Sequence, residues 1–249
     1  MKTIVIKIGT NAITNDDATL NLPLLEKLIQ VFSEIRKENN LLIVTSGAMG
    51  CGRTMIKVDR HDEVTRRQLY AVVGQIKLME TYSKLFEKNG FKIAQMLTTK
   101  DDFNNRVHFL NTKHCVESLF KEEIVPVMNE NDFVAIEELM FTDNDELAGI
   151  ISKMLIADKL IVLTNVEGVY DDKKNVISSF KWNDKMPKSI VTSDKSSFGK
   201  GGMQTKFVMA QDAASNGTEV IITNSKNPGN IMKIINNEEV GTKFTPKQI

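Results

Sequence analysis

EIVPVMNENDFVAIEELMFTDNDELAGIISK, residues 123–153, is the stretch from which the rest of the chain can be placed. Its apolar run at 124–128 has the length and composition of a buried strand, and it ends in the amide and carboxylate cluster NEND at 129–132. A second cluster, DNDE at 143–146, precedes apolar residues at helical spacing, so we expect its carboxylates at a helix N-terminus. The two clusters either hold a polar ligand or serve only as turn and capping residues, since Asn and Asp favour both kinds of position.

Short apolar runs like this one recur along the chain, and segments with helical periodicity separate most of them. The runs cover residues 3–8, 41–44, 91–97, 124–128, 160–163 and 220–222. The clearest helical segments cover about residues 21–39, 62–88 and 105–120. This alternation predicts an α/β fold, a three-layer αβα sandwich with a mainly parallel central sheet. Residues 171–201 form the least regular part, polar and rich in lysine, and we expect a mobile flap there.

The composition excludes several classes of partner. Lys plus Arg balance Asp plus Glu at 32 each, so no net field recruits nucleic acid or an anionic membrane. The sequence has no apolar run of about 18 residues, the length of a membrane span. Cys51 and Cys115 lie far apart without zinc-site spacing, so we assign no metal ligands and expect no disulfide framework. These features predict a cytoplasmic protein with no nucleic-acid or membrane partner.

Polar residues follow four of the predicted strands. In open parallel sheets, ligands bind beyond the carboxyl ends of the strands, so these residues are candidates for a site. They read KIGTN at 7–11, TSGAMGCG at 45–52, NEND at 129–132 and TNVEG at 164–168.

Three features raise the question of a bound phosphate. The segment GAMGCGRT at 47–54 nearly matches a P-loop but has Arg53 where that motif requires Lys, so we reject a P-loop and keep its glycines as weak evidence for a ligand at a helix start. The segment GKGGMQTK at 199–206 precedes a predicted helix, and it forms either a phosphate cradle or a solvated loop. Lys7 lies within an apolar strand, on the face of Val5 and Gly9, where it either extends to solvent at a sheet edge or touches a ligand.

Taken together and in order, these motifs resemble the amino acid kinase family. They are KIGT at 7–10, VTSGA at 44–48, VMNEND at 127–132, DND at 143–145, LTNVEGVY at 163–170 and GGMQTK at 201–206. NEND followed by DND, together with Gly74-Gln75 and QML at 95–97, is similar to the branch that phosphorylates the side-chain carboxylate of glutamate. The resemblance predicts one domain over residues 1–249, without the C-terminal RNA-modification-type (PUA) domain that many members append.

The resemblance also implies roles for individual residues. Lys7 and Lys206 would contact the transferring phosphoryl group, and Asp145 would orient the two lysines. The implied glutamate-binding residues are Ser46, Gly47, Asn129, Asp132 and Asn144. The implied ATP-binding residues are Lys7, Gly9, Thr164, Asn165, Lys200, Gly201, Gly202, Met203 and Lys206, with Asn165 where members commonly have Asp. Glutamate's carboxylates would need donors such as Ser46 and Asn144, and its ammonium would need Asp132 or a carbonyl.

The implied reaction uses ATP and Mg²⁺ to phosphorylate L-glutamate, the first step of proline biosynthesis. The resemblance further implies feedback inhibition by L-proline and a homo-oligomer, a dimer or tetramer. Two alternatives stay open: another branch of the family, acting on N-acetylglutamate, aspartate or uridylate, and a non-catalytic sensor of an amino acid or nucleotide.

Overall fold

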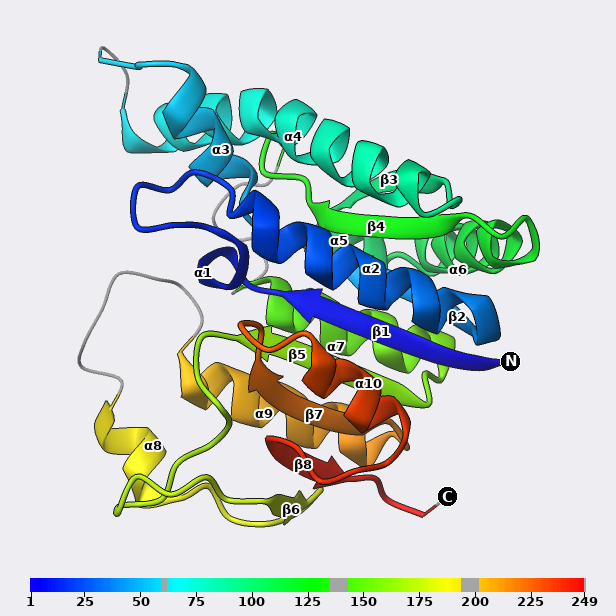
Figure 1. Ribbon diagram of the computed structural model, residues 1–249, viewed down its shortest axis with the longest axis vertical. Helices are drawn as coiled ribbons and strands as arrows, with labels where there is room; N and C mark the ends of the chain where they lie inside the picture. Colours follow the sequence, from blue (N-terminus) through cyan, green and yellow to red (C-terminus); the bar gives the residue numbers. More distant parts are fainter. Residues whose placement is uncertain (60–61, 135–142, 194–201, 249) are drawn as a thin grey trace.

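The structure, a computed structural model, describes residues 1–59, 62–134, 143–193 and 202–248. Each apolar run predicted from the sequence forms a strand, and the described residues contain two further short strands, β6 and β8 (Figure 1). The strands are β1 Lys2–Ile8, β2 Asn39–Val44, β3 Ile93–Thr98, β4 Val125–Glu130, β5 Lys159–Thr164, β6 Ser179–Lys181, β7 Glu219–Asn224 and β8 Thr242–Thr245.

The described strands form one sheet in the order β3-β4-β2-β1-β5-β7-β8-β6. Neighbouring strands from β3 to β7 in this order run parallel, β8 is antiparallel to β7, and β6 is parallel to β8. The mainly parallel sheet predicted from the sequence is therefore confirmed. Because β1 lies between β2 and β5, Lys7 belongs to a central strand and does not lie at a sheet edge.

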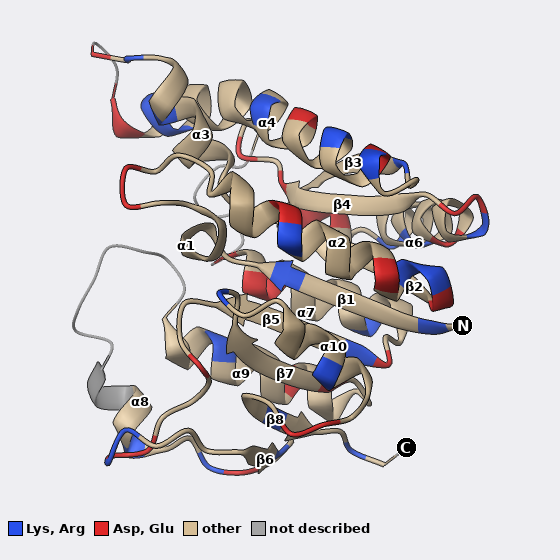
Figure 2. Ribbon diagram, in the orientation of Figure 1, with Lys and Arg blue, Asp and Glu red and all other residues tan. Residues whose placement is uncertain are grey.

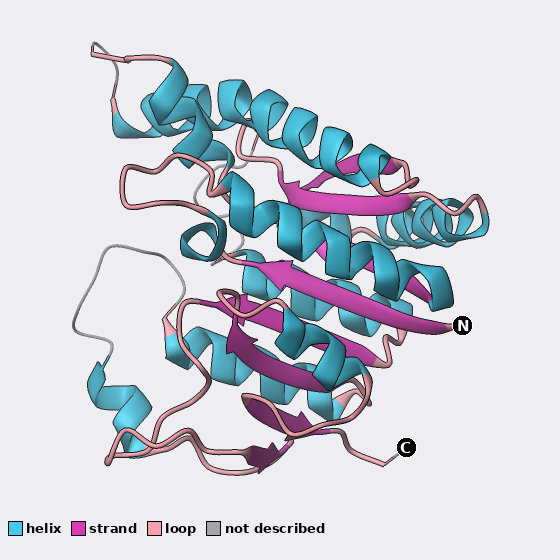
Figure 3. Ribbon diagram, viewed as in Figure 1, coloured by secondary structure: helices cyan, strands magenta, loops and turns pink. Residues whose placement is uncertain are grey.

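Helices cover both faces of the sheet and complete the three-layer sandwich (Figure 3). One face packs against α1 Thr10–Ile13, α2 Leu22–Glu38, α3 Ala48–Met55, α4 Glu63–Lys88 and α10 Gly229–Ile235. The other face packs against α5 Lys100–Asn104, α6 Arg106–Lys121, α7 Asn144–Leu155, α8 Lys188–Ser193 and α9 Met203–Ser215.

The side chains of β1 show how one strand serves both cores. Ile4, Ile6 and Ile8 are buried against α2 and its neighbours, while Val5 is buried on the opposite face with α7. Lys7 follows Val5 on that second face, as the period of two requires. Lys7 is buried there, near the carboxyl end of β1, and Figure 2 shows a basic segment within this strand.

Side-chain caps fix the starts of several helices. Asn21 accepts a hydrogen bond from the backbone N–H of Leu24 at the start of α2, and Asp62 does the same for Thr65 in α4. Asp143 caps α7, which confirms that the DNDE cluster lies at a helix N-terminus. The two polar clusters of residues 123–153 lie at the same edge of the sheet, where both line one cleft.

The region 171–201 is more regular than expected, because it contains β6 and α8. Phe180 of β6 is buried between Phe207 and Phe244, with ring centroids 5.0 and 5.3 Å away. An apolar anchor of this kind explains why a short polar stretch forms an edge strand. Residues 194–201 of the expected flap lie outside the described residues.

Candidate active site

A cleft of about 630 Å³ lies at the carboxyl ends of β1, β2, β4 and β5. All four polar strand ends singled out in the sequence contribute to it, as the parallel register requires. Its lining includes the predicted residues Lys7, Gly9, Ser46, Gly47, Asn129, Asp132, Asn144, Asp145, Thr164, Asn165 and Lys206.

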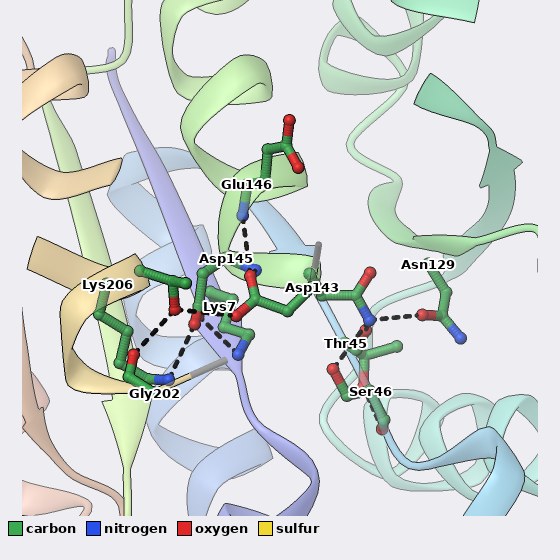
Figure 4. Close-up of polar contacts among 11 residues, drawn as sticks. Lys7, Thr45, Ser46, Asn129, Asp143, Asp145, Glu146, Gly202 and Lys206 are labelled. Carbon is green, nitrogen blue, oxygen red and sulfur yellow. Dashed lines mark hydrogen bonds and ion pairs between the residues drawn. The ribbon is translucent and has the colours of Figure 1, made fainter. Parts of the chain in front are cut away.

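Two lysines meet one aspartate within this cleft. Lys7 Nζ lies 2.6 Å from Asp145 Oδ1, and Lys206 Nζ lies 2.9 Å from Asp145 Oδ2 (Figure 4). The Asp145 side chain is only 1% exposed, whereas that of Lys206 is 14% exposed. One carboxylate thus holds two ammonium groups side by side, and the three groups carry a net positive charge.

Three different elements supply this cluster. Lys7 comes from the end of β1, Asp145 from the first turn of α7, and Lys206 from the first turns of α9. The Asp143 carboxylate fixes the start of α7, since its Oδ1 accepts hydrogen bonds from the backbone N–H groups of Asp145 and Glu146 at 2.8 and 3.2 Å. The helix cap therefore sets the position of the Asp145 backbone.

The pKa values of Asp143 and Asp145 are shifted in opposite directions. Burial would raise the pKa of Asp145, but the charges of Lys7 and Lys206 outweigh it and hold this pKa below its usual value. Burial, joined by the adjacent charge of Asp145, raises the pKa of Asp143 to about 6 against the opposing effect of the same lysines. Asp145 is thus a stable anion near neutral pH, and Asp143 titrates just below it.

A network of amides forms the opposite wall of the cleft. Asn144 Nδ2 lies 2.9 Å from Thr45 O, 2.8 Å from Ser46 Oγ and 2.9 Å from Asn129 Oδ1 (Figure 4). Asn129 Nδ2 in turn donates to Gln75 Oε1 at 2.9 Å. The sequence suggested that Asn144 donates to a substrate carboxylate. In the structure its side-chain nitrogen instead faces protein oxygens.

Gly47 shapes the same wall through its backbone. It precedes α3 with φ at +106°, a left-handed conformation that favours glycine. Gly52 of the rejected P-loop serves packing, because a Cβ there would lie 1.9 Å from the carbonyl oxygen of Tyr70 in α4. Likewise, a Cβ on Gly74 would lie 1.8 Å from Ala48 O. These glycines hold α3 and α4 close together and do not themselves cradle a phosphate.

The residues implied for ATP are only partly brought together. Gly9, Thr164 and Asn165 line the cleft. Gly202 precedes α9 and accepts a hydrogen bond from Thr205 Oγ1, and Met203 packs against the core, so neither lines the cleft. Lys200 and Gly201 lie outside the described residues.

Sequence reasoning missed several charged residues at this cleft. Arg53, Glu63 and Arg67 line it, although Arg53 entered the analysis only as a mismatch to a P-loop. Arg67 and Glu63 lie at the start of the long α4, where surface charges are ordinary. Only their position beside the acidic and amide residues distinguishes them, and that position depends on tertiary structure.

The part of the chain that the structure describes contains neither a clustered metal site nor a membrane-spanning helix. Among the described residues, no group of three or more His, Cys, Asp or Glu side chains is arranged to hold a metal ion. None of the described helices combines the length and apolarity that crossing a membrane requires.

The fold and cleft define an α/β protein that places a positively charged cluster at the carboxyl edge of a parallel sheet, an arrangement suited to an anionic ligand. The model of the amino acid kinase family matches residues 2–224. The chain therefore belongs to the amino acid kinase family.

Individual relatives agree with this assignment. A protein of Chlorobaculum tepidum named glutamate 5-kinase is 40% identical over 253 residues, which are 98% of this chain and 70% of the relative. A protein of Bacteroides thetaiotaomicron with the same name is 37% identical over 252 residues, again 98% and 70%. An isopentenyl phosphate kinase substrate complex has a TM-score of 0.72 at 16% identity, covering 98% of this chain and 100% of that one. The T. acidophilum isopentenyl phosphate kinase product complex has a TM-score of 0.68 at 16% identity, covering 97% and 99%, and both likenesses show the fold alone.

Proposed function

We propose that this protein transfers the γ-phosphoryl group of ATP to the side-chain carboxylate of L-glutamate, giving L-glutamyl 5-phosphate and ADP. The observation that carries the proposal is the Lys7–Asp145–Lys206 cluster in a cleft whose other wall is built of hydroxyl and amide groups. The names of the relatives supply the substrate, and the cluster supplies the charge that phosphoryl transfer requires.

The nucleophile needs no catalytic base. A glutamate side chain is already ionised at pH 7, since its pKa is about 4.3. The described histidines agree with this requirement, because neither His108 nor His114 lines the cleft. The protein's task is to align two anions and to neutralise the charge on the phosphoryl oxygens.

Lys7 and Lys206 would perform that neutralisation. Each ammonium is already held by Asp145, so little reorganisation is needed when the phosphoryl group arrives. Asp145 has both oxygens turned to lysines and acts as their orienting partner. The bond from the γ-phosphorus to the bridging oxygen breaks, ADP leaves with that electron pair, and the new bond joins phosphorus to the glutamate carboxylate oxygen.

The binding assignments follow the two walls of the cleft. We place glutamate against Ser46, Gly47, Asn129, Asp132 and Asn144, and ATP against Gly9, Thr164, Asn165 and the start of α9. Mg²⁺ would enter with ATP, held mainly by phosphate oxygens and water, and would neutralise phosphate charge, so we assign it no protein ligands. A cytoplasmic location, a homo-oligomer and feedback inhibition by L-proline belong to the same proposal.

The test is ADP production from ATP and Mg²⁺ with four acceptors: L-glutamate, N-acetyl-L-glutamate, L-aspartate and UMP. Hydroxylamine in the assay converts an acyl phosphate to a hydroxamate. We expect glutamate-dependent ADP release together with a hydroxamate. Turnover only with another acceptor would overturn the glutamate assignment and retain a kinase. ATP binding with no turnover of any acceptor would favour a sensor.

A further inference from the structure

Asn144, Asn129 and Gln75 form a chain of hydrogen bonds along the cleft wall proposed to bind the acceptor substrate, here called the acceptor wall. Only one orientation of the Asn144 and Asn129 amides is consistent with their backbone partners. The backbone N–H of Glu130 donates to Asn129 Oδ1 at 3.0 Å, so the oxygen of that amide must face the backbone. The Thr45 carbonyl can only accept, so the nitrogen of Asn144 must face it at 2.9 Å. These two backbone groups fix the sense of both side-chain amides, independently of how either amide is assigned.

Gln75 holds the far end of this network. With Asn129 Oδ1 committed to Glu130 and Asn144, Asn129 Nδ2 points away from the cleft and donates to Gln75 Oε1 at 2.9 Å. Gln75 lies on α4, is 9% exposed, and does not line the cleft. Its Nε2 has no hydrogen-bond partner among the described residues, so Oε1 alone ties it to the network.

The near end of the network is the Ser46 hydroxyl. Asn144 Nδ2 lies 2.8 Å from Ser46 Oγ and, as an amide nitrogen, can only donate, so it cannot accept the Ser46 hydroxyl hydrogen. The hydroxyl hydrogen of Ser46 then has to be directed to another acceptor. Ser46 lines the cleft, so this hydrogen is available to a carboxylate of the acceptor substrate.

We propose that Gln75 is a positioning residue for the acceptor substrate: it anchors Asn129 and, through it, Asn144, and so holds in place the amide that directs the Ser46 hydroxyl hydrogen toward the cleft. The neighbouring Gly74 allows Gln75 to reach Asn129 from α4. Because Gly74 has no Cβ, α4 can lie close to Ala48 O and Gly52 N of α3. This inference rests on the proposed function only for the identity of the acceptor substrate. The directions of the hydrogen bonds come from the structure alone.

The first experiment compares Gln75→Met, which removes the acceptor oxygen, with Gln75→Glu, which retains it. In Gln75→Met, Asn129 Nδ2 is left buried without a partner, so we expect the KM for glutamate to rise roughly tenfold or more. The KM for ATP should stay within about twofold, because the network lies on the acceptor wall. Gln75→Glu should recover most of the loss. Gln30→Met, on the exposed face of α2, makes the same chemical change away from the cleft and should match the parent.

A double-mutant cycle separates positioning from general destabilisation. If Gln75 acts through Ser46, then Gln75→Met should add little to Ser46→Ala, and the two effects on glutamate KM should be strongly non-additive. Fully additive effects, an equal rise in the KM for ATP, or equal damage from Gln75→Met and Gln75→Glu would overturn the proposal.

A measurement without turnover keeps this inference distinct from the reaction itself. Side-chain amide NMR of the free protein should show faster hydrogen exchange at Asn129 and Asn144 in Gln75→Met than in the parent or in Gln75→Glu. Unchanged exchange would overturn the network whatever the acceptor proves to be. Absence of glutamate turnover in the parent, with the exchange effect present, would overturn only the proposed reaction.

Discussion

At the scale of single residues, the cluster of Lys7, Asp145 and Lys206 is the part of the site most open to test. Lys7→Ala or Lys206→Ala removes one preorganised cation, so we expect kcat to fall by about 100-fold or more with a smaller change in the KM for glutamate. Steady-state kinetics of both variants provide the measurement. Lys153→Ala is a matched control, since Lys153 pairs with Asp212 on the outer side of α7 and α9. Turnover within tenfold of the parent in either test variant would contradict the assignment.

Asp143 gives the molecule a predicted pH dependence of stability. Its pKa of about 6 in the folded protein exceeds the ordinary value of 3.8, so the folded state binds the proton more tightly. Its contribution to stability is complete below about pH 3.8 and is lost as pH rises through about 6. Asp145 behaves oppositely: its lowered pKa stabilises the fold above pH 3.8, and this effect is lost as pH falls below that value.

Asp143→Asn should remove the first effect and keep the helix cap, because Asn is also a good capping residue. Relative to this variant, the parent should lose about 2 kcal/mol of unfolding free energy between pH 4 and pH 7. Urea unfolding of both proteins at several pH values measures the difference. A difference between the two proteins that is constant over this range would argue against the raised pKa.

These residue-scale features were predictable to different degrees. Lys7 stood out because a lysine inside an apolar strand is costly without a partner, and its partner is Asp145. Gln75 gave only a motif resemblance, and its role depends on α4 lying against β4. The direction of the Asn144 amide was beyond sequence reasoning, since it follows from a backbone carbonyl of another segment.

At the scale of elements, the contact between α3 and α4 sets the acceptor wall. Gly52 and Gly50 lie in the same helix but face different surroundings: a Cβ on Gly50 would meet its nearest atom at an ordinary 3.6 Å, whereas on Gly52 it would lie 1.9 Å from Tyr70 O. Gly52→Ala should therefore cost about 1–3 kcal/mol of unfolding free energy or more, because backbone must move. Gly50→Ala should be neutral or stabilise by up to about 1 kcal/mol.

Denaturant unfolding of the two variants decides this point. Equal stability of Gly52→Ala and Gly50→Ala would show that α3 and α4 are not in tight backbone contact. The glycine spacing of this segment drew attention in the sequence, but for a phosphate. Sequence alone could not separate a glycine that admits a ligand from one that admits a neighbouring helix, because both need only the absence of a side chain.

Two of the described strands, β6 and β8, were not predicted, and the reason is related. The six strands found from the sequence are apolar runs, and all except the partly exposed edge strand β3 are largely buried, which gives a strong local signal. β6 and β8 are short and alternate apolar with polar residues, with Phe180 and Phe244 as their buried members. Their pairing joins segments about sixty residues apart, so the signal is tertiary.

At the scale of the whole molecule, the sheet brings distant segments to one edge. Strand alternation predicted a parallel sheet, and parallel strands place their carboxyl ends together, which is why the scattered motifs converge on one cleft. The order of the strands was not predictable from the same pattern, because it is fixed by pairings between remote segments. The charge balance of the chain likewise gave no hint of the local positive cluster.

The outer strands complete the second core, and Phe244 is the residue that joins them. Its ring lies 5.1 Å from that of Phe207 in α9 and 5.3 Å from that of Phe180 in β6, and it is fully buried. Phe244→Ala should therefore cost about 3–5 kcal/mol of unfolding free energy, since it empties a packed site shared by a helix and two strands. Phe133→Ala is the matched control, because Phe133 is 63% exposed, and it should change stability by less than about 1 kcal/mol.

The same variant tests whether the outer strands and the site depend on each other. Phe244 does not line the cleft, so Phe244→Ala that remains folded at low temperature should retain the parent's kcat while unfolding at a lower denaturant concentration. A single unfolding transition detected both by circular dichroism and by the fluorescence of Trp182, the only tryptophan, would show that β6, β8 and the central sheet unfold together. A separate early transition at Trp182 would instead show that these strands unfold locally. We expect a single transition because the aromatic cluster joins α9 to both outer strands. Phe207 of α9, the helix that also carries Lys206, packs against Phe180 of β6 and Phe244 of β8.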